Sequence, residues 1–370
     1  MNHTRKILVY EFISAGGLGD SLASSSPPAS AEAPSLLAQG VAMRDALVAD
    51  LLAAGLSVSV ADAGLAPLPP DCAAASPLRS GPAAPTDWLA GVAADFDLVW
   101  VIAPECGNQL ARLRDAVGSQ RWIGCDADTL RIATSKRATR ERLAAWGIAT
   151  PHAPGAAARG TPPSTTKATQ AVQAHHPRWV LKPDDGAGSE DTRVFADFAS
   201  ARTAFLRAQA AGRSGPLMTL ESWIPGTPLS LSLLCRRDGC EVLSVNRQRV
   251  APNAAGQVIY AGVDIQAEPV TPEHLALARR ICQALPGLRG FVGIDLVRAD
   301  DGGLHVIEVN PRLTCAYAGL AQKLGRNLAA EIVSDRGDGT RAAPSPPRDT
   351  PHTDEAQGVQ TDRPAPEPAQ

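Results

Sequence analysis

The sequence predicts an N-terminal α/β unit with a doubly wound parallel sheet, followed by an α+β unit with an antiparallel sheet. Before about residue 148, short apolar strands alternate with segments of helical periodicity, which is typical of a parallel sheet. Beyond an Ala/Pro/Thr-rich segment at 148–176, strands follow one another closely, which favours antiparallel pairing. A chain of 370 residues can hold two or three such units.

In the N-terminal unit, we expect buried strands at residues 7–13, 56–61 and 98–102. Apolar residues recur at helical spacing over residues 36–52, and Gly55 follows as a helix stop. These elements, with helical segments between and after the later strands, predict the doubly wound arrangement.

In the second unit, helices are expected near residues 197–210 and 272–285. The predicted strands are 179–182, 217–224, 229–236, 241–246, 290–298 and 305–309. The final segment, 335–370, is rich in Pro, Asp, Arg and Thr with almost no large apolar residue, so we expect it to be disordered.

The composition excludes several classes of function. A net charge of -3 from well-mixed charges gives no reason to expect nucleic acid or an anionic membrane as a partner. The seven cysteines include no Cys-x-x-Cys pair, which argues against a structural zinc site. The first strand begins without a signal-like apolar stretch, so we expect a cytoplasmic protein with free thiols. The P-loop, zinc-protease and serine-hydrolase motifs do not occur, and the first glycine cluster has the wrong spacing for a dinucleotide site.

The strongest functional signal is a pair of acidic residues on two apolar strands joined by a turn. Asp295 lies between Ile and Leu, and Glu308 lies between Ile and Val. Asn310 follows two positions after Glu308, so both side chains share one face of the strand. Buried carboxylates repel each other unless a cation lies between them, and Mg²⁺ prefers oxygen ligands. The alternative is an exposed acidic pair on an edge hairpin. Arg312 is a candidate for binding a phosphoryl oxygen or a substrate carboxylate, and a plain salt bridge is its alternative.

A glycine-rich turn follows the strand that ends at Lys182. Gly186, Gly188 and Ser189 lie in this turn, where backbone N-H groups can approach phosphate closely. Lys182 can reach the same anion. A simple hairpin with an unremarkable lysine is the alternative.

Two further segments are weaker on their own. Ser135 and Lys136 open a helix, where an anion can bind with the lysine beside it. Residues 219–232 predict a strand, a Pro-Gly turn and a second strand; Glu221 and the backbone of Ser222 and Ile224 could face a purine edge. A solvated lysine and an ordinary core hairpin are the respective alternatives.

Taken in order, these segments resemble the ATP-grasp superfamily over about residues 120–333. The resemblance implies a pre-ATP-grasp α/β domain, two α+β lobes that enclose ATP, and a tail. The corresponding ranges are 1–125, 126–218 with the phosphate loop, 219–334 with the metal site, and 335–370.

Further implications of the resemblance concern individual residues. Lys136, Lys182, Gly186, Gly188 and Ser189 would bind the nucleotide phosphates. The residues expected to line the adenine pocket are Glu221, Ser222 and Ile224, and those expected to hold Mg²⁺ or Mn²⁺ are Asp295, Glu308 and Asn310. Arg312 would stabilise the transferring phosphoryl group. Thr227 and Pro228 stand where many relatives carry an acidic residue near the ribose, so the ribose contacts are left open.

The segments ILVYEFISAGGL, SVNRQRV and NPRLTCAYAGL resemble the tyramine-glutamate ligase group, which serves methanofuran-type and methylofuran-type one-carbon carriers. This resemblance implies an amide-forming reaction through an acyl phosphate, with a small carboxylate and an amine as substrates and a possible homodimer. Glu11 with the Gly16-Gly17 turn would line the acceptor side. The candidates for substrate contact are Arg247, also a catalytic candidate, with Arg249, Tyr260 and Tyr317. Ligation of other substrates, of dipeptide or carbamoyl type, and non-catalytic nucleotide binding are the alternatives.

Overall fold

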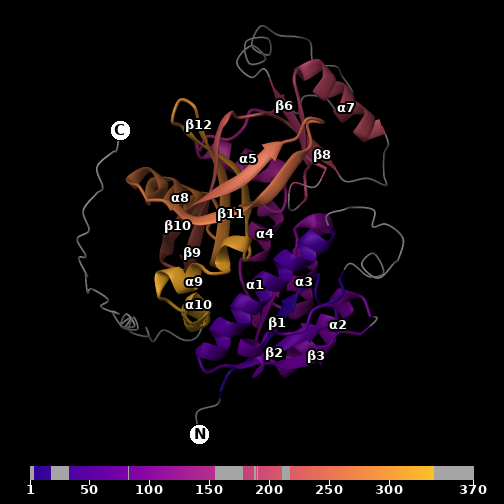
Figure 1. Cartoon of the computed structure of the whole chain (residues 1–370), viewed down its shortest axis with the longest axis vertical. Coiled ribbons are helices and arrows are strands. Elements are labelled where there is room, and N and C mark those ends of the chain that lie inside the picture. Colours follow the sequence, from indigo (N-terminus) through magenta and orange to yellow (C-terminus); the bar gives the residue numbers. More distant parts are fainter. Residues whose placement is uncertain are drawn as a thin grey trace, which may run out of the picture.

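A computed structural model describes residues 4–17, 33–81, 83–154, 178–186, 189, 191–210 and 217–336. The strands within these residues form three sheets, which Figure 1 shows with their surrounding helices. No helix in these ranges is both long enough and apolar enough to cross a lipid bilayer.

The N-terminal sheet is parallel, with the strand order β3-β2-β1-β4-β5. Its strands are β1 (Lys6–Glu11), β2 (Ser57–Asp62), β3 (Ser76–Arg79), β4 (Leu98–Ile102) and β5 (Trp122–Ile123). The helices of this part are α1 (Ala33–Ala53), α2 (Pro85–Val92), α3 (Gln109–Val117), α4 (Ala127–Ala133) and α5 (Lys136–Ala145). The central strands β1 and β4 are almost wholly buried, as expected for a parallel sheet that is covered on both faces. The predicted doubly wound sheet is therefore confirmed.

A second sheet of five strands is antiparallel, with the order β11-β10-β9-β12-β13. Its strands are β9 (Gly226–Arg236), β10 (Gly239–Pro252), β11 (Val258–Glu268), β12 (Gly290–Ala299) and β13 (Leu304–Asn310). The accompanying helices are α8 (Pro272–Ala284), α9 (Leu320–Leu324) and α10 (Leu328–Arg336). Asp335 and Arg336 belong to α10, so the helix extends two residues into the segment expected to be disordered; the rest of that segment lies outside the described residues.

The third sheet has the order β7-β6-β8 and carries a single long helix. It consists of β6 (Trp179–Pro183), β7 (Arg193–Phe195) and β8 (Met218–Ser222), with α7 (Phe198–Ala210) beside them in Figure 1. β8 pairs with β6 and ends at Ser222. The hydrogen bonds between β6 and β8 hold this sheet together.

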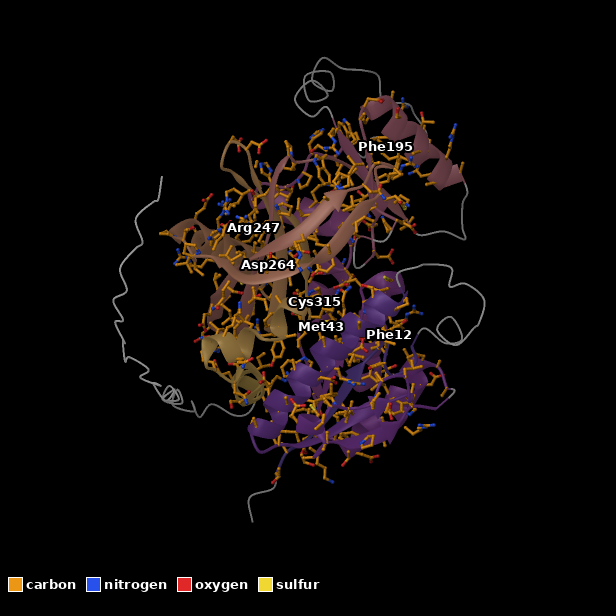
Figure 2. The ribbon with its side chains drawn as sticks, viewed as in Figure 1. Phe12, Met43, Phe195, Arg247, Asp264 and Cys315 are labelled. Carbon is orange, nitrogen blue, oxygen red and sulfur yellow. The ribbon has the colours of Figure 1, made fainter. Side chains whose placement is uncertain are left out.

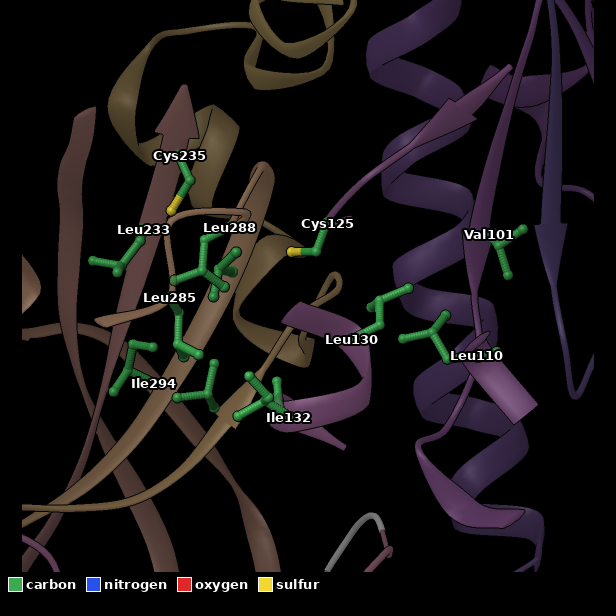
Figure 3. Packing of buried hydrophobic residues seen from close by; sticks show 14 of the residues in the cluster. Val101, Leu110, Cys125, Leu130, Ile132, Leu233, Cys235, Leu285, Leu288 and Ile294 are labelled. Atoms are coloured by element: carbon green, nitrogen blue, oxygen red, sulfur yellow. The ribbon is translucent and has the colours of Figure 1, made fainter. Parts of the chain in front are cut away.

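The N-terminal sheet and the five-stranded sheet share one hydrophobic core. It includes Val101 and Leu110 from the first unit and Leu233 and Ile294 from the second, and Figure 3 shows these side chains on both sides of the junction. A second shared cluster joins α1 to the region around Tyr317. The three-stranded sheet has a small cluster of its own around Trp179, and a second small cluster joins its Val180 and Val194 to Val258 of β11. The two large sheets therefore form one platform, to which the small sheet is attached.

Candidate functional site

A cavity of about 270 Å³ lies where the three sheets meet. Its walls come from the end of β1, α1, the first turn of α5, β6, β8 and the strands of the five-stranded sheet. It gathers the predicted residues Lys136, Lys182, Gly186, Ser189, Glu221, Ser222, Ile224, Asp295, Glu308, Asn310 and Arg312. Gly188 lies outside the described residues.

The acidic pair lies at the floor of this cavity. Asp295 on β12 is the cross-strand partner of Glu308 on β13. The amide groups of Gln248 and Asn310 donate to the two Asp295 oxygens, Oδ1 and Oδ2, at 2.8 and 3.1 Å. Burial and the nearby Glu308 raise the pKa of Asp295 well above its usual range. Burial also works to raise the pKa of Glu308, but the charges of Lys136 and Lys182 outweigh it, so the net shift is downward.

These residues fit a hard divalent cation. Like charges on directly opposed residues destabilise a sheet unless they are compensated, and Asp295 and Glu308 are directly opposed. Two carboxylates with an adjacent amide oxygen are the small ligand set that Mg²⁺ uses alongside phosphate and water oxygens. In the described part of the chain, no cluster of three His, Cys, Asp or Glu side chains has metal-binding geometry. Water and phosphate oxygens would complete the coordination of Mg²⁺ at such a site.

Lys136 is held at the start of α5 by an unusually complete cap. The Ser135 side chain accepts from the backbone N-H of Ala138 and donates to Asp184 at 2.7 Å. Lys136 Nζ donates to the carbonyl of Gly186 at 2.8 Å and lies 3.4 Å from Glu308. Burial lowers the pKa of Lys136, but Glu308 and Glu105 outweigh it and the net shift is upward. The ammonium group of Lys136 therefore lies between the glycine-rich turn and the acidic pair.

Lys182 is paired with Glu221, a residue expected to line the adenine pocket. Lys182 Nζ lies 2.8 Å from Glu221 Oε2, and Arg140 Nη1 donates to Glu221 Oε1 at 2.8 Å. The side chains of Lys182 and Glu221 are only 6% and 2% exposed, so this ion pair lies almost out of water. One carboxylate thus holds two cations at the wall of the cavity.

Ser222, which was also expected to line the adenine pocket, is held in place by His152. The backbone of His152 exchanges hydrogen bonds with Ser222: the Ser222 N-H donates to the His152 carbonyl at 2.7 Å, and the His152 N-H donates to Ser222 Oγ at 2.9 Å. Ile224 lies at the same wall. Ser189, in the glycine-rich turn, has a φ of 70°, a left-handed conformation that is rare for residues other than glycine.

Arg312 forms a buried ion pair with a residue of the N-terminal unit. Its Nη2 donates to Glu105 Oε2 at 2.8 Å, and the two side chains are 13% and 5% exposed. The other oxygen, Glu105 Oε1, is buried without a hydrogen-bond partner among the described residues. Arg312 Nη1 also donates to the carbonyl of Leu313 at 2.9 Å, so the guanidinium is anchored across the junction at the edge of the cavity.

On the predicted acceptor side, Glu11 and Tyr260 line the cavity. The Glu11 carboxylate accepts from the backbone N-H groups of Ile13 and Ser14, at 3.1 and 2.7 Å. Burial nevertheless raises the pKa of Glu11. This buried carboxyl group is the strongest polar feature of that wall.

The structure does not place Arg247, Arg249 or Tyr317 in the cavity. Arg247 pairs with Glu268 at 2.8 Å, Arg249 pairs with Asp264, and Tyr317 donates to Asp50 at 2.6 Å. Figure 2 shows Arg247 next to Asp264 on the outer strands. Side chains alternate along a strand, so Gln248 points into the cavity while its two arginine neighbours point away. This geometry does not support the expected catalytic position of Arg247.

Among the residues not predicted from the sequence are Glu105, Arg140 and Gln248, which contact Arg312, Glu221 and Asp295. Gln248 could have been identified from the sequence. It lies between the two arginines of the SVNRQRV segment, so on a strand its side chain points to the opposite face. Glu105 and Arg140 come from a loop and a polar helix face without a motif. Only the fold brings them to the site.

Two domain models match the chain. A pre-ATP-grasp domain model matches residues 57–130, and an ATP-grasp domain model matches residues 133–316. The tyramine–L-glutamate ligase of Methanocaldococcus jannaschii is 23% identical over 244 residues, which are 65% of this chain and 63% of that protein.

Solved structures resemble the chain over most of its length. An ATP-grasp superfamily protein from Archaeoglobus fulgidus is similar at a TM-score of 0.60 with 19% identity, covering 90% of this chain and 88% of that one. An L-amino acid ligase from Bacillus licheniformis is similar at 0.57 with 18% identity, covering 91% and 75%.

Proposed function

The chain belongs to the ATP-grasp superfamily, and from this premise we propose that it is an ATP-dependent, ADP-forming ligase that joins a carboxylate to an amine. The observation that carries the proposal is the Asp295–Glu308 pair, which faces Lys136 and Lys182 in one cavity. A protein that only bound adenine would not need to hold two opposed carboxylates beside two lysines.

The proposed roles follow from these positions. Lys136 and the backbone around Gly186 would bind phosphate oxygens, while Ser222 and Ile224 would line the adenine pocket. Lys182 would contact phosphate from its place beside Glu221. Asp295, Glu308 and Asn310 would hold Mg²⁺, which when bound would neutralise phosphate charge and align the γ-phosphate.

In the proposed reaction, a substrate carboxylate oxygen attacks the γ-phosphorus and the bond to the β-phosphate oxygen breaks, so that ADP leaves. The amine nitrogen then attacks the acyl carbon, inorganic phosphate leaves, and the nitrogen loses a proton. The chain contributes positioning and charge neutralisation rather than a nucleophile. Arg312, fixed by Glu105, is placed to bind the substrate carboxylate or the transferring phosphoryl oxygens.

For the substrates, we propose glutamate as the carboxylate and tyramine or a similar amine. The resemblance to the tyramine–L-glutamate ligase supports this choice, although this chain matches only 63% of that protein's length. The buried carboxyl group of Glu11 offers a partner for an ammonium group on the acceptor side. Ligation of a different carboxylate and amine is the second candidate, favoured by the structural likeness to an amino acid ligase fold.

A coupled assay for ADP release tests the proposal. Purified protein with ATP, Mg²⁺, glutamate and tyramine should release ADP and yield a product whose mass equals the sum of the substrates less one water. An amine and carboxylate screen with mass detection separates the first candidate from the second. Background ADP release with every pair would disprove ligase activity.

The Lys182→Met variant should bind ATP about 10 to 100 times more weakly, since a charge-assisted hydrogen bond contributes about 1.5 to 3 kcal/mol. Its fold should persist because Glu221 keeps its contact with Arg140. Calorimetric titration with a non-hydrolysable ATP analogue measures the change. Lys323→Met, on α9, is the matched control and should bind as the unmodified chain does. If both variants bind the analogue with equal affinity, Lys182 does not belong to the phosphate site.

A further inference from the structure

A second cavity, of about 280 Å³, lies at the junction between the N-terminal unit and the five-stranded sheet. Its walls come from the end of α3, the turn after β5, the β9–β10 hairpin, residues 286–290 and the end of α10. It has no lining residue in common with the first cavity. Figure 3 shows Cys125 and Cys235, two residues of its wall, on either side of the junction.

The charge of this cavity is strongly one-sided. Five arginines line it: Arg114, Arg236, Arg237, Arg289 and Arg336. The carboxylates in its wall are those of Asp126 and Asp335. Asp126 is already engaged, because its side chain accepts from the backbone N-H of Thr129 as the N-cap of α4. The wall therefore presents more positive than negative charge.

Several of these guanidinium groups have no acidic partner. Arg237, Arg289 and Arg336 form no ion pair with any residue in the described ranges. Arg289 Nη1 donates to the carbonyls of Pro286 and Leu288, at 2.9 and 2.6 Å. Arg336 Nη2 donates to the carbonyls of Ser119 and Gln120, both at 3.0 Å. These carbonyl groups orient the two side chains, but being neutral they do not compensate the positive charge of the guanidinium groups.

The remaining two arginines have carboxylate partners. Arg114 pairs with the exposed Asp115. Arg236 shares Glu241 and Glu331 with Arg326, and neither carboxylate lines the cavity. The Nε atoms of Arg114 and Arg336 are buried without a hydrogen-bond partner in the described structure. Burial and the neighbouring Arg237 lower the pKa of Arg336, as expected where positive charges crowd together.

We propose that this cavity is a binding site for a small oxyanion that carries at least two negative charges. Guanidinium groups match the oxygens of phosphate and carboxylate groups in a bidentate way, and unpaired ones at a junction are stabilised when an anion joins them. The volume suits a phosphate-bearing or polycarboxylate metabolite rather than a macromolecule. Because the arginines come from both units, the bound anion links the N-terminal unit to the five-stranded sheet.

The test is calorimetric titration of the full chain with inorganic phosphate and, separately, with citrate, at constant ionic strength. Phosphate represents the phosphate-bearing metabolites, and citrate represents the polycarboxylates. The double variant Arg237→Ser/Arg289→Gln should bind the preferred probe about tenfold or more weakly, because it loses two charge-assisted contacts. Arg207→Ser, an exposed arginine on α7, is the matched control and should leave the affinity unchanged.

Two further measurements keep the test decisive. The chain saturated with a non-hydrolysable ATP analogue should bind the probe with the same affinity as the free chain, which separates this site from the first cavity. The preferred probe should also raise the melting temperature of the unmodified chain and not that of the double variant. Binding of phosphate or of citrate that the double substitution weakens supports the proposal and identifies the class of anion. No saturable binding of either probe with a Kd below about 1 mM, or equal affinity in the double variant, overturns it.

Discussion

Replacing Glu308 with glutamine is expected to lower the turnover number of the proposed ligase by about 10³-fold or more, because the lost cation site supplies several kcal/mol of charge stabilisation to the transferring phosphoryl group. The change removes one charge and keeps the side-chain volume. Asp295→Asn should behave alike, since its carboxylate is the cross-strand partner of Glu308. ADP release at saturating substrate measures the effect.

The folded state should survive both substitutions. Relief of the repulsion between the two carboxylates offsets the loss of the Lys136–Glu308 contact, so the melting temperature should stay close to that of the unmodified chain. Glu273→Gln, an exposed position in the first turn of α8, makes the same chemical change in the same lobe and should retain full turnover. Near-normal rates in Glu308→Gln would rule out the metal assignment.

The second large effect concerns stability. Glu221→Leu should destabilise the chain by about 3 to 5 kcal/mol, because it leaves the charges of Lys182 and Arg140 without their buried partner. Differential scanning calorimetry should show the loss as an earlier transition of the part that contains the three-stranded sheet. The same substitution should also weaken nucleotide binding, since Glu221 and Lys182 both line the first cavity.

An exposed ion pair on α5 serves as the control for this buried one. Glu141 pairs with Arg137 one helical turn away at 3.4 Å, with both side chains more than half exposed. Glu141→Leu should therefore change stability by about 0.5 kcal/mol or less. A similar small loss in Glu221→Leu would mean that Lys182 and Arg140 find other partners or regain water, contrary to the structure.

Much of the fold was predictable because the strands carry strong local patterns. Apolar residues dominate β1, β4, β6, β12 and β13, and the helices α1, α5 and α8 have clear stops or caps. The missed strands β3 and β5 are short, and the missed β11 is an edge strand with a mixed polar pattern and an internal Gly262. Short and edge strands depend on their neighbours more than on their own sequence.

The site was predictable to the extent that its residues lie in apolar strands or beside turns. Asp295 and Glu308 stood out because polar residues interrupted apolar runs, and the structure places them opposite each other. The ion pairs between these units could not be predicted in the same way. No local pattern links Glu105 to Arg312 across 207 positions, or Arg140 to Glu221 across 81. The sequence contains the charges, but their pairing depends on how the three sheets pack.

The separate core of the three-stranded sheet has a thermodynamic consequence. Trp179, Ala201 and Leu220 form its buried centre, apart from the large core that joins the other two sheets. A unit with so small a core opens at a lower free energy than the platform that carries it. The measured affinity for a nucleotide held between them equals the intrinsic affinity multiplied by the fraction of molecules in which this sheet is ordered. A cavity-forming substitution at Leu220 should thus weaken ligand binding at temperatures where the rest of the chain remains folded.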